Sequence, residues 1–241
     1  MIAGTKADTV ISIIEKIPLK ARNQVTEITL DMAANMGLVA KKCFPNATRV
    51  TDRFHVQKLA LEALQEIRIK YRWQAIDLEN EAIEKAKSSK KKYNPILLAN
   101  DDTVKQLLAR SRYFLYKNKS KWSKNQAERA KILFKLYPDI EKAYNLAQDL
   151  RNIFEKTTDK IIGLSRLAKW HEKVNQSGFK SFNTISRSIM NHYQTILNYF
   201  HNRSTNASAE SFNAKIKAFR SQFRGVRNVE FFLLRLTNIY A

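Results

Sequence analysis

The sequence predicts an α/β fold that is mostly helical, and three observations lead to this prediction. Only five glycines and four prolines interrupt the 241 residues. Long stretches repeat apolar residues at helical spacing. Two short apolar runs, residues 25–30 and 47–51, are typical of strands and flank a helical segment at 33–43. With 44% apolar residues, the chain can bury a core in one or two domains.

The first part of the chain predicts a small parallel sheet. A helix is expected over residues 8–17, and Pro18 ends it before the first strand. Two strands joined by a helix in so short a span are best explained by a right-handed parallel crossover. Asp31 follows the first strand and Asp52 follows the second. We therefore expect both carboxylates at the carboxyl edge of the sheet, where open α/β sheets bind ligands.

The rest of the chain is expected to be helical. One long helix runs from residue 56 to about 88 and ends at the basic run 88–92, which we expect to be a solvent-facing loop. Further helices are expected at residues 101–118, 123–136, 139–156, 158–175, 178–200 and 207–220. This helical block separates the strand pair from Glu210, so only folding brings Glu210 back to the sheet edge.

The charge predicts a polyanionic partner. The chain has 43 Lys and Arg against 22 Asp and Glu, a net charge of +21, which favours nucleic acid. A membrane surface is the usual alternative, but the apolar runs are far too short to span a bilayer. A single cysteine, Cys43, excludes an internal disulfide and a cysteine-rich zinc site. The N-terminus lacks the pattern of a signal peptide, so a cytoplasmic location is expected.

Carboxylates at strand ends and on a late helix are the layout of a metal-dependent nuclease or strand transferase. Each candidate also has an ordinary interpretation. Asp31 and Asp52 each precede a helix and are suited to capping it, and the pattern alone favours a cap for Asp31. His55 is suited to a hydrogen-bonded, half-buried position, and Glu210 to a helix surface or a capping arrangement.

A set of motifs resembles a known family. The motifs are Ile-Thr-Leu-Asp-Met at 28–32, Phe-Pro-Asn-Ala at 44–47, Asp-Arg-Phe-His-Val at 52–56, and Thr205 and Asn206 followed by Glu210, Asn213, Ile216 and Lys217. Together they resemble the catalytic domain of bacterial insertion-sequence transposases of the DDE class, in the group whose acidic core is interrupted by a long helical insertion. The resemblance covers nearly the whole chain, including residues 108–113 and the Trp122, Gln126 and Arg129 pattern.

The resemblance implies a ribonuclease-H-like fold with catalytic acids on the first strand, at the end of the fourth strand, and on a helix after the fifth. Asp31 corresponds to the second acid and Glu210 to the Glu, and both are implied to be catalytic and to bind Mg²⁺ or Mn²⁺. Asp52 and His55 match the family's Asp-x-x-His signature. The first Asp has no counterpart, so the resemblance implies an N-terminally truncated catalytic domain that is inactive alone.

The implied organisation is a partial ribonuclease-H-like core at residues 1–56, a helical insertion at 57–202, and a region carrying the Glu at 203–241. Positions close to catalysis are Asp52, His55, Asn206 and Asn213. The cations expected to contact DNA phosphates are Arg53, Lys215, Lys217, Arg220, Arg224 and Arg227. The ordinary interpretation of the late cations is a solvated face, with Phe219 and Phe223 in the core.

The expected function is metal-dependent DNA cleavage and strand transfer during transposition and DNA recombination of an insertion sequence. The expected partners are the element ends, target DNA and a second copy of the chain, with no membrane. The alternative is a basic helical remnant that binds DNA without cutting it.

Overall fold

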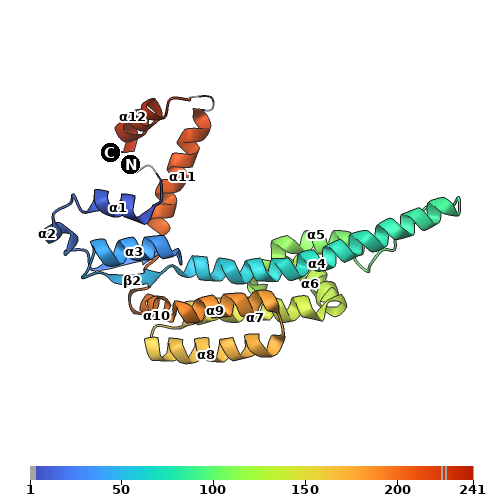
Figure 1. Ribbon diagram of the computed structural model, residues 1–241. Coiled ribbons are helices and arrows are strands. Elements are labelled where there is room, and N and C mark those ends of the chain that lie inside the picture. Colours follow the sequence, from blue (N-terminus) through green and yellow to red (C-terminus); the bar gives the residue numbers. More distant parts are fainter. Residues whose placement is uncertain (1–3, 224, 226, 241) are drawn as a thin grey trace. The chain divides into compact units, whose positions relative to one another are not determined.

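The computed structural model describes residues 4–223, 225 and 227–240 (Figure 1). The chain divides into two compact units. The sheet unit contains residues 1–55 and 194–241, and the helical unit contains residues 56–193. The predicted fold class, α/β and mostly helical, is confirmed: among the described residues, the regular elements are one pair of strands and otherwise helices.

The sheet unit is built on two parallel strands. β1 (Glu27–Leu30) pairs with β2 (Thr48–Thr51), with Glu27 opposite Thr48 and Leu30 opposite Thr51. α3 (Ala34–Cys43) connects them. The predicted order of strand, helix and parallel strand is therefore confirmed. Val50 and Thr51 are buried, which ties the carboxyl end of β2 into the core.

Two helices precede the strands. α1 (Ala7–Ile14) packs on α3 through Ile11, Val39 and Cys43, all buried. Cys43 is thus a packing residue. The short α2 (Leu19–Arg22) was not predicted. Its Arg22 Nη1 donates to the Cys43 carbonyl at 2.7 Å and so satisfies a carbonyl that the end of α3 leaves open.

α10 (Tyr193–Asn202) lies along the strands, on the opposite side from α3 (Figure 1). The Thr195 and Thr51 hydroxyls lie 2.7 Å apart, and Asn198 Nδ2 donates to the Arg49 carbonyl at 2.9 Å. Asn202 Nδ2 donates to the Glu27 carboxylate at 2.8 Å. These bonds join the end of a long helical block back to the sheet.

The single helix expected over residues 178–200 is wrong. α9 (Lys180–Asn191) ends at His192, where φ −110° and ψ 14° leave the helical conformation before α10 begins. The His192 N–H contacts the carbonyls of Ser188 and Ile189, both at 3.2 Å. Apolar residues keep helical spacing across this one-residue break, so the pattern did not reveal it.

The chain ends with two helices in the sheet unit. α11 (Ala207–Gln222) and α12 (Val229–Tyr240) meet where the Phe219 ring lies 5.4 Å from the Phe232 ring. Phe219 is buried, which fits the core interpretation of this residue. α12 was not predicted, because its four adjacent apolar residues obscure the helical period.

The helical unit contains most of α4 (Arg53–Ser88), then α5 (Val104–Leu115), the short 3₁₀ helix η1 (Lys119–Lys121), α6 (Lys124–Leu136), α7 (Pro138–Lys156), α8 (Lys160–Ser177) and α9. The basic run 88–92 is exposed and leaves the helix after residue 88. Trp122 packs against Phe114 and Tyr144, with ring centroids 5.5 and 5.4 Å away. Its Nε1 donates to the Phe114 carbonyl at 2.8 Å.

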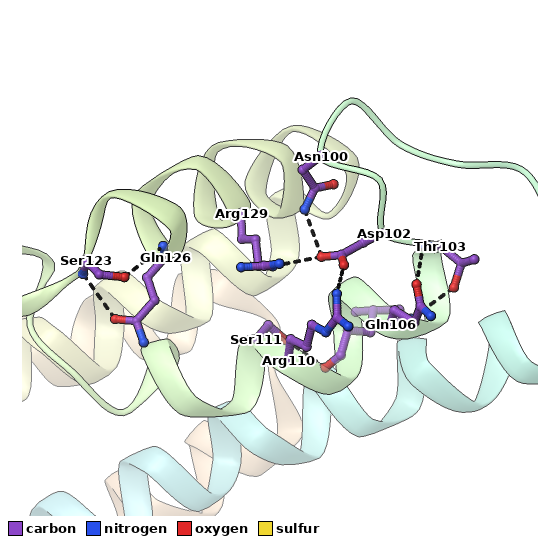
Figure 2. Close-up of polar contacts among 10 residues, drawn as sticks. Asn100, Asp102, Thr103, Gln106, Arg110, Ser111, Ser123, Gln126 and Arg129 are labelled. Atoms are coloured by element: carbon purple, nitrogen blue, oxygen red, sulfur yellow. Dashed lines mark hydrogen bonds and ion pairs between the residues drawn. The ribbon is translucent and has the colours of Figure 1, made fainter.

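A buried carboxylate joins three segments of the helical unit (Figure 2). Asp102 is 1% exposed. It accepts from Asn100 Nδ2 and from Arg129 Nε, each at 2.8 Å, and forms an ion pair with Arg110. Arg110 lies on α5 and Arg129 on α6, so the carboxylate holds both helices to the loop before α5. Capping boxes start these helices at Thr103 with Gln106 and at Ser123 with Gln126.

We predict that Asp102→Asn destabilises the helical unit by about 3 kcal/mol, because two arginines lose their charged partner and one acceptor becomes a donor. The matched control, Asp101→Asn, changes an exposed neighbour at φ 59° that Asn tolerates, and should cost under about 0.5 kcal/mol. All three tryptophans lie in this unit, so denaturant unfolding followed by tryptophan fluorescence measures it directly. Equal stabilities of the two variants would contradict the role of Asp102.

Candidate active site

The strand register brings Asp31 and Asp52 to the same edge. Leu30 is opposite Thr51, the last pair of the ladder, and each acid is the next residue along its strand. The Asp52 N–H donates to the Leu30 carbonyl at 2.8 Å, which extends the ladder by one bond. The two acids therefore lie side by side where the parallel strands end.

The Asp52 carboxylate is fully buried and accepts two backbone N–H groups. Oδ1 accepts from Phe54 at 2.9 Å, which caps the first turn of α4. Oδ2 accepts from Asn206 at 3.0 Å, across a separation of 154 residues. The capping interpretation of Asp52 is therefore correct, and the same carboxylate also fastens a distant segment to the sheet edge.

This second bond positions Glu210. Asn206 is the residue before α11, and the Glu210 N–H donates to the Asn206 carbonyl at 2.9 Å. Glu210 thus lies in the first turn of α11, one turn after the residue that Asp52 holds. The strand register places Asp31 beside Asp52. The bond from Asn206 to Asp52 places Glu210 one helical turn from the residue that Asp52 holds.

Asp31 and Glu210 differ from Asp52 because their side chains are exposed. Asp31 Oδ1 accepts from the Ala33 N–H at 3.0 Å, a local turn, while Ala33 itself occupies the cap position of α3. The capping interpretation of Asp31 is therefore wrong. Glu210 does not cap α11 either, since the Asn206 position has no side-chain cap bond.

The two exposed acids have the donor chemistry that Mg²⁺ or Mn²⁺ requires, since both supply hard carboxylate oxygens. Within the described part of the chain, no three His, Cys, Asp or Glu side chains lie close enough together to hold a metal ion. Asp52 is committed to two backbone N–H groups. A metal site at this edge would therefore rest on the pair Asp31 and Glu210, and that pair stays a prediction.

His55 and Arg53 lie beside Asp52 in the first turn of α4. His55 Nδ1 is 3.9 Å from Asp52 Oδ2, too far for a hydrogen bond, and has no hydrogen-bond partner among the residues that the structure describes. The Arg53 guanidinium lies 4.8 Å from the Phe54 ring centroid and 5.8 Å from that of Tyr199. Cation–π contacts thus hold Arg53 in place.

A polar stripe runs along one face of α11 and begins at Asn206, the residue that donates to Asp52. Positions at i, i+4, i+7, i+11 and i+14 share one helix face. Here they are Asn206, Glu210, Asn213, Lys217 and Arg220, and the last four are exposed. Lys215 and Arg227 are also exposed, whereas Arg224 lies outside the described residues. Asn213 and two of the expected DNA-contacting cations therefore follow Glu210 along the same face.

Sequence reasoning missed the three polar residues of α10 that hold the sheet, Thr195, Asn198 and Asn202. They recur at i, i+3 and i+7 within a helix whose other face is buried. A polar stripe of this kind on a largely apolar helix was the available signal, and it predicts hydrogen bonds to another element.

A family model described as a transposase, that of the DDE transposases of the ISL3 group, matches residues 1–236. The chain belongs to this transposase family. It is 22% identical over 236 residues to the transposase for insertion sequence element IS1001 of Bordetella parapertussis. The match covers 97% of this chain and 52% of that relative, so the chain spans about half the relative's length. No solved structure matches the chain.

None of the described helices is long and apolar enough to cross a membrane.

We predict that Asp52→Ala loosens the start of α11 by about 2 kcal/mol or more. The change removes a helix cap and leaves the Asn206 N–H without its acceptor. Hydrogen exchange of the Phe54, Asn206 and Glu210 amides measures the effect residue by residue. In the matched control, Asp31→Ala, only the exposed Ala33 turn is lost, so these three amides should keep their protection. Unchanged exchange in Asp52→Ala would contradict the fastening role.

Proposed function

We propose that this chain supplies the carboxyl edge and the Glu-bearing helix of a DDE transposase that cuts and joins DNA. Asp31 and Glu210 are the proposed metal-binding catalytic acids, with Mg²⁺ or Mn²⁺ as the ion. The observation that carries the proposal is the bond from Asn206 to the Asp52 carboxylate. It brings a helix from the end of the chain to the parallel strand ends, which is the layout that this chemistry needs.

The proposed roles follow from burial. Asp52 is a positioning residue, because both of its oxygens are used by backbone N–H groups. Asp31 and Glu210 are exposed and available to ligands. When bound, divalent ions activate the attacking oxygen and stabilise the leaving oxygen of a phosphodiester. The family membership and the net charge of +21 support DNA as the substrate.

The exposed cations of α11 are proposed to hold phosphates next to the acids. Lys217 lies two turns beyond Glu210 on the same face, and Arg220 lies about one turn further. Contacts from these side chains to phosphates position DNA without selecting its sequence. The proposed site thus combines two acids with basic side chains that follow Glu210 on α11.

We predict that Mn²⁺ binds weakly at Asp31 and Glu210, since a site with two free carboxylates lacks the charge to hold two divalent ions tightly. Paramagnetic broadening of amide NMR signals by Mn²⁺ should centre on residues 31–33 and 209–211. Asp31→Ala and Glu210→Ala should each remove the broadening. Two other exposed acids, each in the first turn of a helix as Glu210 is, provide control variants, Asp8→Ala and Glu230→Ala, and should leave the broadening intact. Broadening that is indifferent to Asp31 and Glu210 would overturn the assignment.

We further predict that the 241 residues alone do not cleave supercoiled plasmid or element ends in Mg²⁺ or Mn²⁺. The first Asp of the family has no counterpart among the matched motifs, and Asp52 cannot replace it without releasing α11. The assay includes an Asp31→Ala/Glu210→Ala variant. Cleavage by the unaltered chain that the double variant abolishes would show that another residue completes the acid set.

A second candidate function is DNA binding without cleavage. The +21 charge favours it, as does the lack of a three-ligand group in the part of the chain that the structure describes. The Mn²⁺ experiment separates the two, because a remnant that only binds DNA has no reason to keep metal affinity at Asp31 and Glu210.

A further inference from the structure

A groove between α7 and α8 is lined by exposed cations. These cations are distant in sequence from Asp31 and Glu210. Its cavity of about 320 Å³ is lined by Asp149, Asn152, Ile153 and Lys156 of α7 and by Arg166, Lys169, Trp170 and Lys173 of α8. Each set follows the spacing i, i+3, i+4 and i+7, so each comes from one face of its helix. Figure 1 shows the two helices side by side.

The two helices are antiparallel and held in register by bonds that line or flank the groove. Trp170 Nε1 donates to the Leu146 carbonyl at 2.8 Å, and the buried indole forms the floor. Arg166 donates to the Lys156 carbonyl at 3.2 Å and to the Thr157 hydroxyl at 2.8 Å. The packing of α7 against α8 therefore fixes the backbone positions that carry the cations.

The groove carries an excess of positive charge. Lys173 Nζ lies 2.8 Å from the Asp149 carboxylate, the one acid of the lining. Lys156 and Lys169 are exposed and form no ion pair within the described residues. Four cations against one carboxylate leave a net charge of +3.

Local helix electrostatics explain only part of this cluster. Cations at the end of α7 complement its partly negative terminus, and this accounts for Lys156 and Arg166. Lys169 and Lys173 lie in the middle and later part of α8, away from that terminus. Their alignment with the first pair suits a linear ligand of negative charge.

We propose that this groove binds the phosphate backbone of duplex DNA, as a second contact surface for the substrate inferred above. The inference rests on the proposed function for the identity of that ligand. From Arg166 to Lys173 the helix rises about 10.5 Å, which corresponds to about three phosphates of one strand when measured along the duplex axis. Trp170 is buried and offers no face to a base. The contact should therefore be independent of sequence.

Equilibrium binding of a duplex of arbitrary sequence, measured by fluorescence anisotropy without divalent metal, tests the proposal. Lys156→Gln/Lys169→Gln should lower the association constant about tenfold or more near 0.1 M salt and reduce the salt slope by about two. The matched control, Lys131→Gln/Lys135→Gln, removes the same charge from exposed positions of α6 and should change binding by under about twofold. Tryptophan fluorescence during unfolding verifies that each variant is folded.

A measurement on the unaltered chain provides independent support. Lysine acetylation followed by mass spectrometry should show Lys156 and Lys169 protected when DNA is bound, and Lys131 and Lys135 modified as before. If the groove variant binds like the control variant, or if DNA leaves Lys156 and Lys169 unprotected, the groove proposal is overturned. The active-site proposal is tested separately by Mn²⁺ binding at Asp31 and Glu210, which involves no DNA.

Discussion

The Asp52 carboxylate accepts one N–H from the first turn of α4 and another from Asn206, and the candidate site depends on these two bonds. A buried carboxylate suits this position because it offers two acceptor oxygens and no donor. An amide in its place would turn an N–H donor toward one of the two backbone N–H groups. The requirement is geometric as well as electrostatic, because the bond from the Asp52 N–H to the Leu30 carbonyl fixes the backbone of Asp52 at the end of the ladder.

Asp102 has a similar role in the helical unit, where its buried carboxylate joins a loop to two helices (Figure 2). The contacts of the helical unit account for several of its motif residues without a catalytic role. Gln126 completes a capping box, Arg129 binds Asp102, and Trp122 packs in an aromatic cluster. These three residues match the family motifs, and in this chain they stabilise the fold of the helical unit. The sheet unit carries the three candidate acids Asp31, Asp52 and Glu210.

The sequence predicted the elements near Asp31 and Asp52 because strand and helix periods alternate clearly there. It predicted that Asp31 and Asp52 lie at the same edge of the sheet, because the carboxyl ends of parallel strands meet at one edge. It did not predict the break at His192, where the apolar spacing continues across the interruption, or α12, whose adjacent apolar residues hide the period. It also assigned Asp31 a cap that Ala33 occupies. Short local turns depend on backbone angles, which residue types alone do not fix.

The link from Asp52 to Asn206 was beyond sequence reasoning for a different reason. It joins a side chain to a backbone N–H, and a backbone group leaves no residue-type signal at position 206. The sequence placed Glu210 with the early acids only through the layout of the carboxylates and the motif resemblance. The structure supplies a physical basis for that placement in the hydrogen bonds that fasten α10 and α11 to the strands.

The bond from Asn206 to Asp52 should bring the Glu210 end of α11 to Asp31. Spin labels attached through Asp31→Cys and Glu210→Cys, in a Cys43→Ala background, measure the distance between these positions by pulsed electron resonance. A narrow distribution at short distance that broadens and lengthens when Asp52→Ala is added is the predicted result. A broad or long distribution in the presence of Asp52, or one that is unchanged by its removal, would show that Asp52 does not position Glu210 next to Asp31.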